Sequence, residues 1–361
     1  MTVSRRRRQL VQAGAWAWAA PAWSVTAQGV RPRPLRFPQD HGAHPDTRTE
    51  WWYITGTLLA GERLHGFQIT FFRSRTDVAD THPSRFAARQ LLFAHAAVTD
   101  LAGRRLRHDE RIARRGFGIA EASEDDTSVV LRTWHLQREG TPSRYRARAD
   151  SDTGRFAFDL VLAASQPVLL QGQAGYSRKG PRPDEASHYY SEPQLRVEGT
   201  LQLDGRAQPV TGTAWLDHEW SDTLLDPQAV GWDWIGMNLD DGGALTAFRL
   251  RRADGSALWA GGSHRAPDGA TRDFGPDEVA FTPVRRWTSA GSRATYPVEW
   301  TVATPAGRHV VKALLDDQEL DSRASTGSIY WEGLSDLLDA QGRRVGRGYL
   351  EMTGYAGAMK L

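Results

Sequence analysis

The chain of 361 residues has no cysteine and only four methionines, and beyond its first 27 residues it has no apolar run long enough to cross a bilayer. Without cysteine there can be no disulfide framework, so stability must come from packed cores. A sustained helical period is also missing, and only FAARQLLFAH (86–95) could form a single helical turn. These absences exclude a disulfide-stapled scaffold and a helix bundle, and we expect a soluble or peripheral protein.

Recognised catalytic motifs are missing as well. The chain has no H-E-x-x-H, no Walker loop and no G-x-G-x-x-G opening a helix, and GYSRKG (175–180) lacks the second glycine of a nucleophile elbow. His41, His44, His95 and His218 could converge on a metal, but no two of them show a recognised ligand spacing. The sequence therefore predicts neither a metal nor a cofactor.

The first 27 residues are typical of an export signal. SRRRRQLV is followed by the apolar GAWAWAAPAW and by VTA before Gln28, which predicts a removable signal peptide over 1–27. Its arginine pair resembles a twin-arginine signal, so we expect a periplasmic or secreted protein. Removing this segment takes the formal net charge from +2 to −2, because it holds four Arg and no acid. Nothing in that balance favours nucleic acid as a partner.

Alternating apolar and polar residues dominate the rest of the chain. Segments such as YITGTLL, RFAFDLVLA, LRVEGTLQL and RGYLEMTGY have a period of two and are bounded by Gly, Asp, Pro or Ser. Residues 28–49 are rich in Pro and Arg and read as a linker. The sequence therefore predicts an all-β fold of barrels or sandwiches.

The chain also matches itself twice. Residues 51–70 align without a gap on 232–251, with identities that include Trp51/Trp232 and Phe67/Phe248. Residues 198–217 align on 332–351, pairing Glu198 with Glu332 and Asp217 with Glu351. A long unit that occurs twice indicates two whole domains. We expect an N-terminal domain over 28–224 and a C-terminal domain over 225–361.

The two offsets differ by 47 residues, so the first copy must carry additional chain. The Gly- and Pro-rich stretch 165–193 is the expected insertion, because a long ordered loop that carries aromatic residues commonly covers a site. Tyr176 or Tyr190 would then pack over a mouth between the domains.

Tryptophan and acids cluster in the same segments. Trp215 and Trp220 bracket Asp217, His218 and Glu219, and eleven Trp remain after residue 27. Burial beside aromatic rings raises a carboxyl pKa, and ring faces stabilise a carbocation. The alternative is that the Trp side chains fill barrel cores and the acids face solvent. In a strand, Asp217 and Glu219 share one face and His218 and Trp220 the other.

At these segments the chain resembles a known family. HPDTRTEWWYITGTL, QGQAGYSRKGP, SHYYSEPQL, GTAWLDHEWSD, GWDWIGMNLDDG and YWEG…GYLEMTGY look like motifs of the AttH-like family. This family includes carotenoid 1,2-hydratases, kievitone hydratase and exported proteins called predicted secreted hydrolases. The resemblance runs from about residue 38 to the C-terminus. It implies two tandem lipocalin-like β-barrel domains and cofactor-free addition of water to a prenyl-type C=C bond, with His218 and Trp220 in a segment tied to that activity.

Two hypotheses follow. The first is a hydratase-type lyase or a hydrolase acting on an isoprenoid or lipid-like molecule, and the second is a non-catalytic carrier of such a molecule. Peripheral association with a membrane or a transporter stays open, as does the oligomeric state. For the enzyme, Asp217 is the first choice of proton donor and Glu219 the second, with His218 orienting the donor or activating water. The expected substrate-binding residues are Trp220, Trp232, Asp233, Trp234, Glu50, Trp51, Tyr53, His95, Tyr176 and Tyr190.

Overall fold

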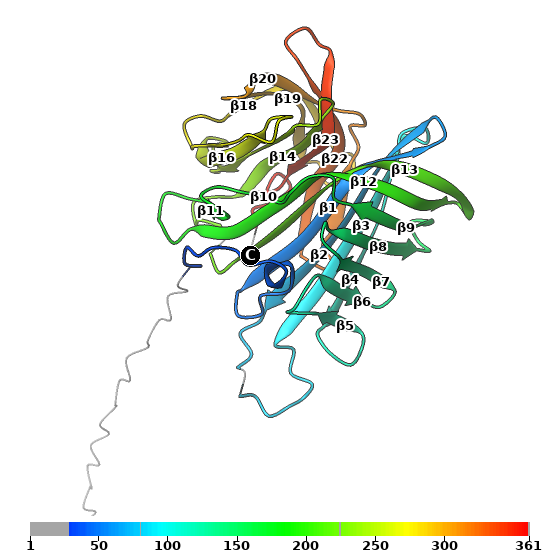
Figure 1. Cartoon of the computed structure of the whole chain (residues 1–361), viewed down its shortest axis with the longest axis vertical. Coiled ribbons are helices and arrows are strands. Elements are labelled where there is room, and N and C mark those ends of the chain that lie inside the picture. Colours follow the sequence, from blue (N-terminus) through cyan, green and yellow to red (C-terminus); the bar gives the residue numbers. More distant parts are fainter. Residues whose placement is uncertain (1–28, 80, 224, 360–361) are drawn as a thin grey trace, which may run out of the picture.

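The fold is all-β, as predicted. In the computed structural model, residues 29–79, 81–223 and 225–359 are described, and the expected signal peptide therefore lies outside the described residues. Two antiparallel sheets carry nearly all of the regular structure, and a 3₁₀ turn (η1, Gln39–His41) precedes the first strand. No helix in the described part of the chain could span a membrane. Figure 1 shows the two sheets side by side.

The first sheet has the order β4-β3-β2-β1-β13-β12-β9-β8-β7-β6-β5, with β10 and β11 paired to β12. A bridge between Gly116 and Ala120 joins the chain after β4 to β5, so this sheet nearly closes into a barrel. Its strands are β1 (Thr49–Ala60), β2 (Arg63–Arg75), β3 (Gln90–Asp100), β4 (Arg105–Arg114), β5 (Ala120–Ala122), β6 (Ser128–Leu131), β7 (Trp134–Glu139), β8 (Arg144–Ser151), β9 (Phe156–Ala163), β10 (Leu169–Leu170), β11 (Tyr176–Arg178), β12 (Ala186–Leu203) and β13 (Arg206–Ser221).

The second sheet repeats this arrangement with fewer strands. Its order is β17-β16-β15-β14-β23-β22-β20-β19-β18, and β21 pairs with β22. Its strands are β14 (Gly231–Leu239), β15 (Ala244–Arg251), β16 (Ala257–Arg265), β17 (Thr271–Phe274), β18 (Ala280–Thr288), β19 (Thr295–Thr304), β20 (Gly307–Ala313), β21 (Glu319–Ser322), β22 (Ser328–Leu338) and β23 (Arg344–Met352).

Strand register supports the internal duplication. Tyr53 of β1 lies opposite Asp217 of β13, and Trp234 of β14 lies opposite Glu351 of β23. The first self-match aligns Tyr53 with Trp234, and the second aligns Asp217 with Glu351, so the two pairs are equivalent. Strand β1 therefore corresponds to β14, and β13 corresponds to β23. Each sheet therefore pairs its opening strand with its last strand, and Asp217 and Glu351 occupy equivalent positions.

The other strand of each self-match does not correspond, because the hairpin loops differ in length. Phe67 is buried in the core of the first barrel, whereas Phe248 packs in a cluster between the barrels. Glu198 lies opposite Thr211, whereas Glu332 lies opposite Glu351. The sequence pairings Phe67/Phe248 and Glu198/Glu332 are therefore wrong, and the register places Ser191, opposite Asp217, where the second half has Glu332.

Side chains fill both barrels. The first interior holds a large apolar cluster that includes Trp52, Phe71 and Trp134, and the second holds one that includes Trp300 and Trp331. A third cluster, with Trp215, Trp234, Phe248 and Tyr349, lies where the halves meet, and β1 packs against β23 as β13 packs against β14. The outer faces of the opening and last strands thus form the contact between the barrels.

The segment 165–193 is more regular than the expected loop. It contains β10, β11 and the first residues of β12, all paired within the first sheet. The additional length of the first half is also spread over the connection between β2 and β3 and the region of β5 and β6.

Candidate functional site

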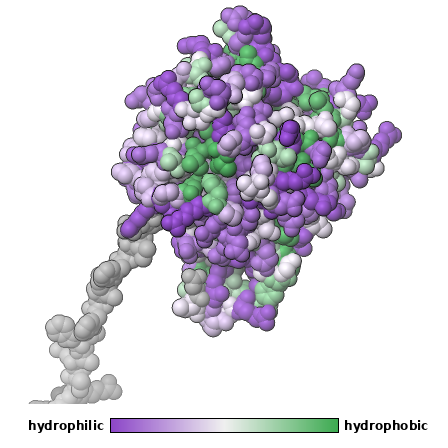
Figure 2. Space-filling view, in the orientation of Figure 1, coloured by the Kyte–Doolittle hydropathy of each residue, from purple (hydrophilic) through white to green (hydrophobic). Residues whose placement is uncertain are grey.

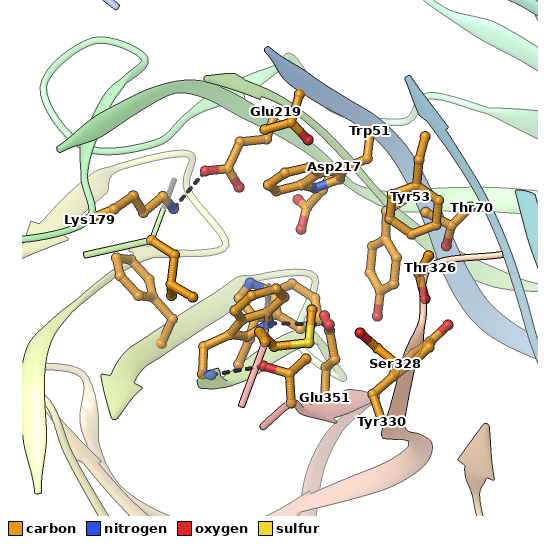
Figure 3. Close-up of a pocket in the computed structure, with 18 of the residues that line it drawn as sticks. Trp51, Tyr53, Thr70, Lys179, Asp217, Glu219, Thr326, Ser328, Tyr330 and Glu351 are labelled. Atoms are coloured by element: carbon orange, nitrogen blue, oxygen red, sulfur yellow. Dashed lines mark hydrogen bonds and ion pairs between the residues drawn. The ribbon is translucent and has the colours of Figure 1, made fainter. Parts of the chain in front are cut away.

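A cavity of about 620 Å³ lies between the two barrels, outside both interiors. Its walls come from the outward faces of β1, β2, β3 and β13 in the first half and of β14, β15, β22 and β23 in the second. Figure 3 shows Tyr53 and Asp217 of the first half facing Tyr330 and Glu351 of the second. Its lining includes Trp51, Tyr53, Gln68, Thr70, Phe72, Phe93, His95, Lys179, Tyr189, Asp217, Glu219, Trp232, Trp234, Phe248, Leu250, Tyr330, Glu332 and Glu351.

Strand alternation splits the segment Asp217–Trp220 between two environments. Asp217 and Glu219 face the cavity, whereas His218 and Trp220 face the opposite side of β13. This split follows the alternation expected from the sequence. The His218 side chain points away from the cavity, so it can neither orient Asp217 nor activate a water molecule there.

Asp217 is buried and held by three donors. Trp215 Nε1 (2.7 Å) and Ser191 Oγ (2.5 Å) donate to its Oδ1, and the Tyr189 hydroxyl donates to its Oδ2 (2.8 Å). Burial raises the pKa of Asp217 to about 7, although these hydrogen bonds favour the anion. Asp217 can therefore hold a proton below about pH 7, but its oxygens are largely engaged by protein donors.

Glu332 and Glu351 form an acidic pair in the wall that the second half contributes to the cavity. They lie opposite each other on β22 and β23. Burial raises the pKa of Glu351 to about 8, and burial together with the neighbouring Glu351 charge raises the pKa of Glu332 well above its usual range. Glu332 is buried and Glu351 half-buried, and two neighbouring carboxyl groups on paired strands cannot both ionise at little cost, so the raised pKa values favour a proton on the pair.

The hydrogen bonds leave this pair open toward the cavity. Glu351 Oε1 accepts from Trp232 Nε1 (3.1 Å), and Glu332 Oε2 accepts from Gln68 Nε2 (2.6 Å). Three buried polar atoms here, Glu332 Oε1, Gln68 Oε1 and the Tyr53 hydroxyl, make no hydrogen bond of good geometry among the described residues, although the Tyr53 hydroxyl lies close enough to Glu332 to interact with it. Buried polar atoms are rarely left unpaired, so this end of the cavity suits a ligand hydroxyl or a water molecule.

Lys179 closes the other end. Its Nζ lies 2.9 Å from Glu219 Oε1 and over the rings of Tyr189 and Phe248, at 4.6 and 4.3 Å from their centroids. Glu219 also accepts a hydrogen bond from Ser187. The ion pair occupies the Glu219 carboxylate, so Glu219 is a poorer proton donor than the sequence suggested.

A separate polar cluster lies on the opposite face of β13 and β1. Glu50 is fully buried and accepts from Arg73 Nε (2.7 Å), His44 Nδ1 (2.7 Å) and His218 Nε2 (2.9 Å). His44 Nε2 lies 3.0 Å from Asp40, and the His44 ring stacks on Trp220 at 3.7 Å between centroids. We call His44, Glu50, Arg73 and His218 the Glu50 cluster.

The charge states in the Glu50 cluster are the reverse of those in the cavity. Burial opposes ionisation of Glu50, but hydrogen bonds from His218 and His44 outweigh it and hold the Glu50 pKa well below its usual range. Burial likewise opposes the His44 cation, yet its bonds to Asp40 and Glu50 raise the His44 pKa. Burial lowers the pKa of His218 to about 4, so that ring is neutral.

Among the described residues, His44, Glu50 and His218 are the three side chains whose geometry could hold a metal ion. Both His44 nitrogens, however, face carboxylates, and the remaining Glu50 oxygen is bound by Arg73. Protons already satisfy these groups, so the cluster fits a structural ion network better than a metal centre.

The structure therefore separates the residues proposed from the sequence into two groups. Seven line the cavity, and six lie elsewhere. Asp233 is buried with Arg249 and Arg251 on the opposite face of β14, Tyr190 is buried between His41 and His218, and Tyr176 bonds to the Pro183 carbonyl. The residues in the cavity are Trp51, Tyr53, His95, Asp217, Glu219, Trp232 and Trp234, and those outside it are Glu50, Tyr176, Tyr190, His218, Trp220 and Asp233.

Other lining residues were missed. Tyr189, the neighbour of Tyr190, is the aromatic residue of that segment that reaches the cavity, and Lys179, Gln68 and Glu332 also line it. A signal existed for Glu351, which the self-match placed at the position of Asp217. For Glu332 the same match pointed to Glu198, which is exposed on β12.

Comparison with known proteins agrees with this architecture. The model of the family described as AttH-like matches residues 28–355. A crystal structure of a protein provisionally assigned as AttH from Nitrosomonas europaea is 49% identical, with a TM-score of 0.84, over 90% of this chain and 98% of that one. Kievitone hydratase from Nectria haematococca is 16% identical with a TM-score of 0.68, over 90% and 94% of the two chains, which shows a shared fold. None of the curated proteins matches this chain.

Proposed function

The chain belongs to the AttH-like family, and from this premise we propose that the cavity between its barrels is the active site of a hydratase-type lyase. The substrate class is an apolar isoprenoid or lipid-like alkene. One observation carries the proposal: buried Asp217 and half-buried Glu351, two carboxyl groups whose pKa values are raised, face a wall of tryptophan and tyrosine rings. The fold shared with kievitone hydratase, an enzyme named for hydration, supports the same chemistry.

The reaction needs an acid, a shelter for a cation and a water molecule. The Glu351 carboxyl transfers its proton to the less substituted alkene carbon, and the π electrons form the new C–H bond. The tertiary carbocation then lies beside the rings of Trp232 and Trp234, whose electron-rich faces stabilise it. Water adds to the cation, and its surplus proton passes to the Glu351 carboxylate. The acid is restored, and the net change is the addition of one water molecule.

Glu351 suits the donor role better than Asp217. Asp217 accepts three hydrogen bonds, whereas among the described residues Glu351 accepts one, from Trp232. Its neighbours Glu332 and Gln68 carry the unpaired oxygens that can hold the attacking water. Asp217 would then keep the opposite wall neutral and position Tyr189 and Trp215.

A carrier of lipophilic molecules is the second candidate, because aromatic side chains such as Trp51, Phe72 and Phe248 line much of the cavity. A carrier gains nothing from burying acids, since each buried carboxyl group costs desolvation energy. The acids therefore favour the enzyme.

The test uses heavy-oxygen water and a panel of isoprenoid alkenes and alcohols. We expect the parent to add labelled water to an alkene in the panel, detected by mass spectrometry, and Glu351→Gln to lose this activity by about 10²–10⁴-fold. Quenching of tryptophan fluorescence should show that the variant still binds the same molecule. Binding without turnover by the parent would transfer support to the carrier. Equal turnover by both proteins would instead exclude Glu351 as the proton donor.

A further inference from the structure

One end of the first barrel carries an exposed aromatic tip. Phe86, in the connection between β2 and β3, is 62% exposed, and Phe117, in the turn after β4, is 47% exposed. Their rings stack face to face at 5.3 Å, and Ile112 and Ile119 nearby are also exposed. These four make up most of the seven exposed large apolar side chains of the described residues. The face in Figure 2 is mostly hydrophilic, so such a cluster needs an explanation.

The backbone holds Phe117 outward. Gly116, Phe117 and Gly118 have φ angles of 117°, 62° and 68°, so three consecutive residues are left-handed. A bulky side chain rarely adopts this conformation, and such strain is often found at functional positions. The turn thus keeps an apolar ring at its apex although the ring gains no burial there.

Arginine side chains flank the two rings. The Arg114 guanidinium lies 4.4 Å from the Phe117 centroid and 5.2 Å from that of Phe86, and Arg85 lies 5.4 Å from Phe117. Neither Arg85 nor Arg114 forms an ion pair with a carboxylate among the described residues, whereas the next residue, Arg115, pairs with Glu121 and Glu124. Arg85 is exposed, and Arg114 is half-buried with an Nη1 atom that has no hydrogen-bond partner in the described part of the chain. Exposed aromatic rings between unpaired cations match the boundary of a bilayer with anionic headgroups, where rings enter the interface and arginines meet phosphates.

An apolar row connects the tip to the cavity. Phe72 and Phe93, which line the cavity, stack at 5.1 Å on adjacent strands, and Phe93 lies opposite Ile112 on β4. Arg114 follows two residues after Ile112, on the same face of that strand. The outer face of β2, β3 and β4 therefore runs from the cavity to the tip without leaving one side of the sheet.

We propose that Phe86 and Phe117, with Arg85 and Arg114, form a docking site for the surface of an anionic membrane. The apolar row then gives a bilayer-dissolved molecule a short path into the cavity. Docking by this tip does not depend on the chemistry proposed for the cavity, because none of its four residues lines the site.

The experiment is flotation of the whole protein with vesicles of phosphatidylcholine alone or mixed with phosphatidylglycerol. We expect the parent to bind the mixed vesicles and to release at high salt. The double variant Phe86→Ser/Phe117→Asn should bind at least about tenfold more weakly, since asparagine tolerates the left-handed conformation and keeps the turn. Val284→Ser removes an equally exposed apolar side chain from the second barrel and should bind as the parent does.

The charge contribution is tested separately with Arg85→Gln/Arg114→Gln, which should weaken binding to the mixed vesicles and reduce its dependence on salt. Circular dichroism checks that each variant is folded. A parent that fails to bind mixed vesicles at low salt overturns the proposal and leaves the tip to a protein partner. Equal binding by the parent and the aromatic double variant overturns it as well.

Discussion

Asp217 and Glu50 are buried acids on opposite faces of the β1–β13 pair, and their pKa values are shifted in opposite directions. Toward the cavity, Asp217 has aromatic neighbours and neutral donors, and its pKa is raised. On the opposite face, in the neighbouring strand β1, Glu50 has Arg73 and His44 as partners, and its pKa is lowered. Both carboxyl groups are buried, so burial alone does not decide the charge. The partners decide it: Asp217 has neutral donors, whereas its neighbour Glu219 on the same face is ion-paired with Lys179. An acid without a cationic partner is the one suited to acid catalysis.

The largest expected effect is on turnover, and it differs between the two acids of the cavity. Glu351→Gln should lower turnover by about 10²–10⁴-fold, whereas Asp217→Asn should cost less than this, because Asp217 supports the wall and does not transfer the proton. Initial rates in the labelled-water assay measure both. His218→Gln, on the other face of the same strand, is the control for an indirect effect through β13. A larger loss for Asp217→Asn would restore the order expected from the sequence.

Substitutions in the Glu50 cluster should change the free energy of unfolding more than substitutions of the cavity acids. Glu50→Ala leaves Arg73 and the His44 cation buried without their partner, so the free energy of unfolding should fall by about 3–5 kcal/mol. Glu351→Gln replaces a largely neutral acid with a neutral amide of the same shape and should change this free energy by less than about 1 kcal/mol. Urea unfolding followed by tryptophan fluorescence compares the two. Equal losses would mean that the two faces do not differ in charge state.

The free energy of unfolding should depend on pH with opposite sign for the cavity acids and for Glu50. Asp217 and Glu351 have ordinary pKa values of 3.8 and 4.5 and folded values of about 7 and about 8. The folded state therefore keeps protons that the unfolded chain releases, and their contribution is lost as pH rises from about 4 to about 8. The lowered pKa of Glu50 acts in the opposite direction, and its contribution is lost only in acid.

Unfolding free energies measured at intervals across this pH range check the sign. Glu351→Gln should make the loss between about pH 5 and pH 8 shallower, because it removes one cavity acid whose pKa is raised and also the charge that helps to raise the pKa of Glu332. An unchanged slope would show that Glu351 titrates normally in the folded protein.

The sequence predicted which residues of β13 share a face, but not the opposite charge states of the two faces. Strand alternation correctly separated Asp217 and Glu219 from His218 and Trp220. The same rule, applied consistently, would have removed Glu50 from the site, because it lies on the opposite face of β1 from Trp51 and Tyr53. Alternation is local, so a sequence is enough to find it.

The register between paired strands was harder to predict from the sequence than the alternation within a strand. The self-match placed Asp217 and Glu351 at equivalent positions, but it paired Glu332 with exposed Glu198 because the loops joining the two hairpins differ in length. Lys179 and Gln68 carry no local signal, since each reaches the cavity through tertiary packing. The sequence also did not show that the cavity lies outside the barrels, a property of how two folded halves meet.

The smallest expected effect concerns the hydroxyl of Tyr53. It is buried and interacts with the Glu332 carboxyl without a hydrogen bond of good geometry among the described residues, so Tyr53→Phe should change the free energy of unfolding by no more than about 1 kcal/mol. If the hydroxyl meets a polar group of the substrate or the attacking water, the same variant should bind or turn over up to about tenfold less well. Tyr145→Phe is the matched control, because the Tyr145 hydroxyl donates to buried Glu192 (2.5 Å) inside the first barrel. That change should cost about 1–3 kcal/mol of stability and leave ligand binding unchanged. A destabilised Tyr53→Phe with normal binding would make the unpaired hydroxyl part of the packing between the barrels, and the polar end of the cavity would then lose its role.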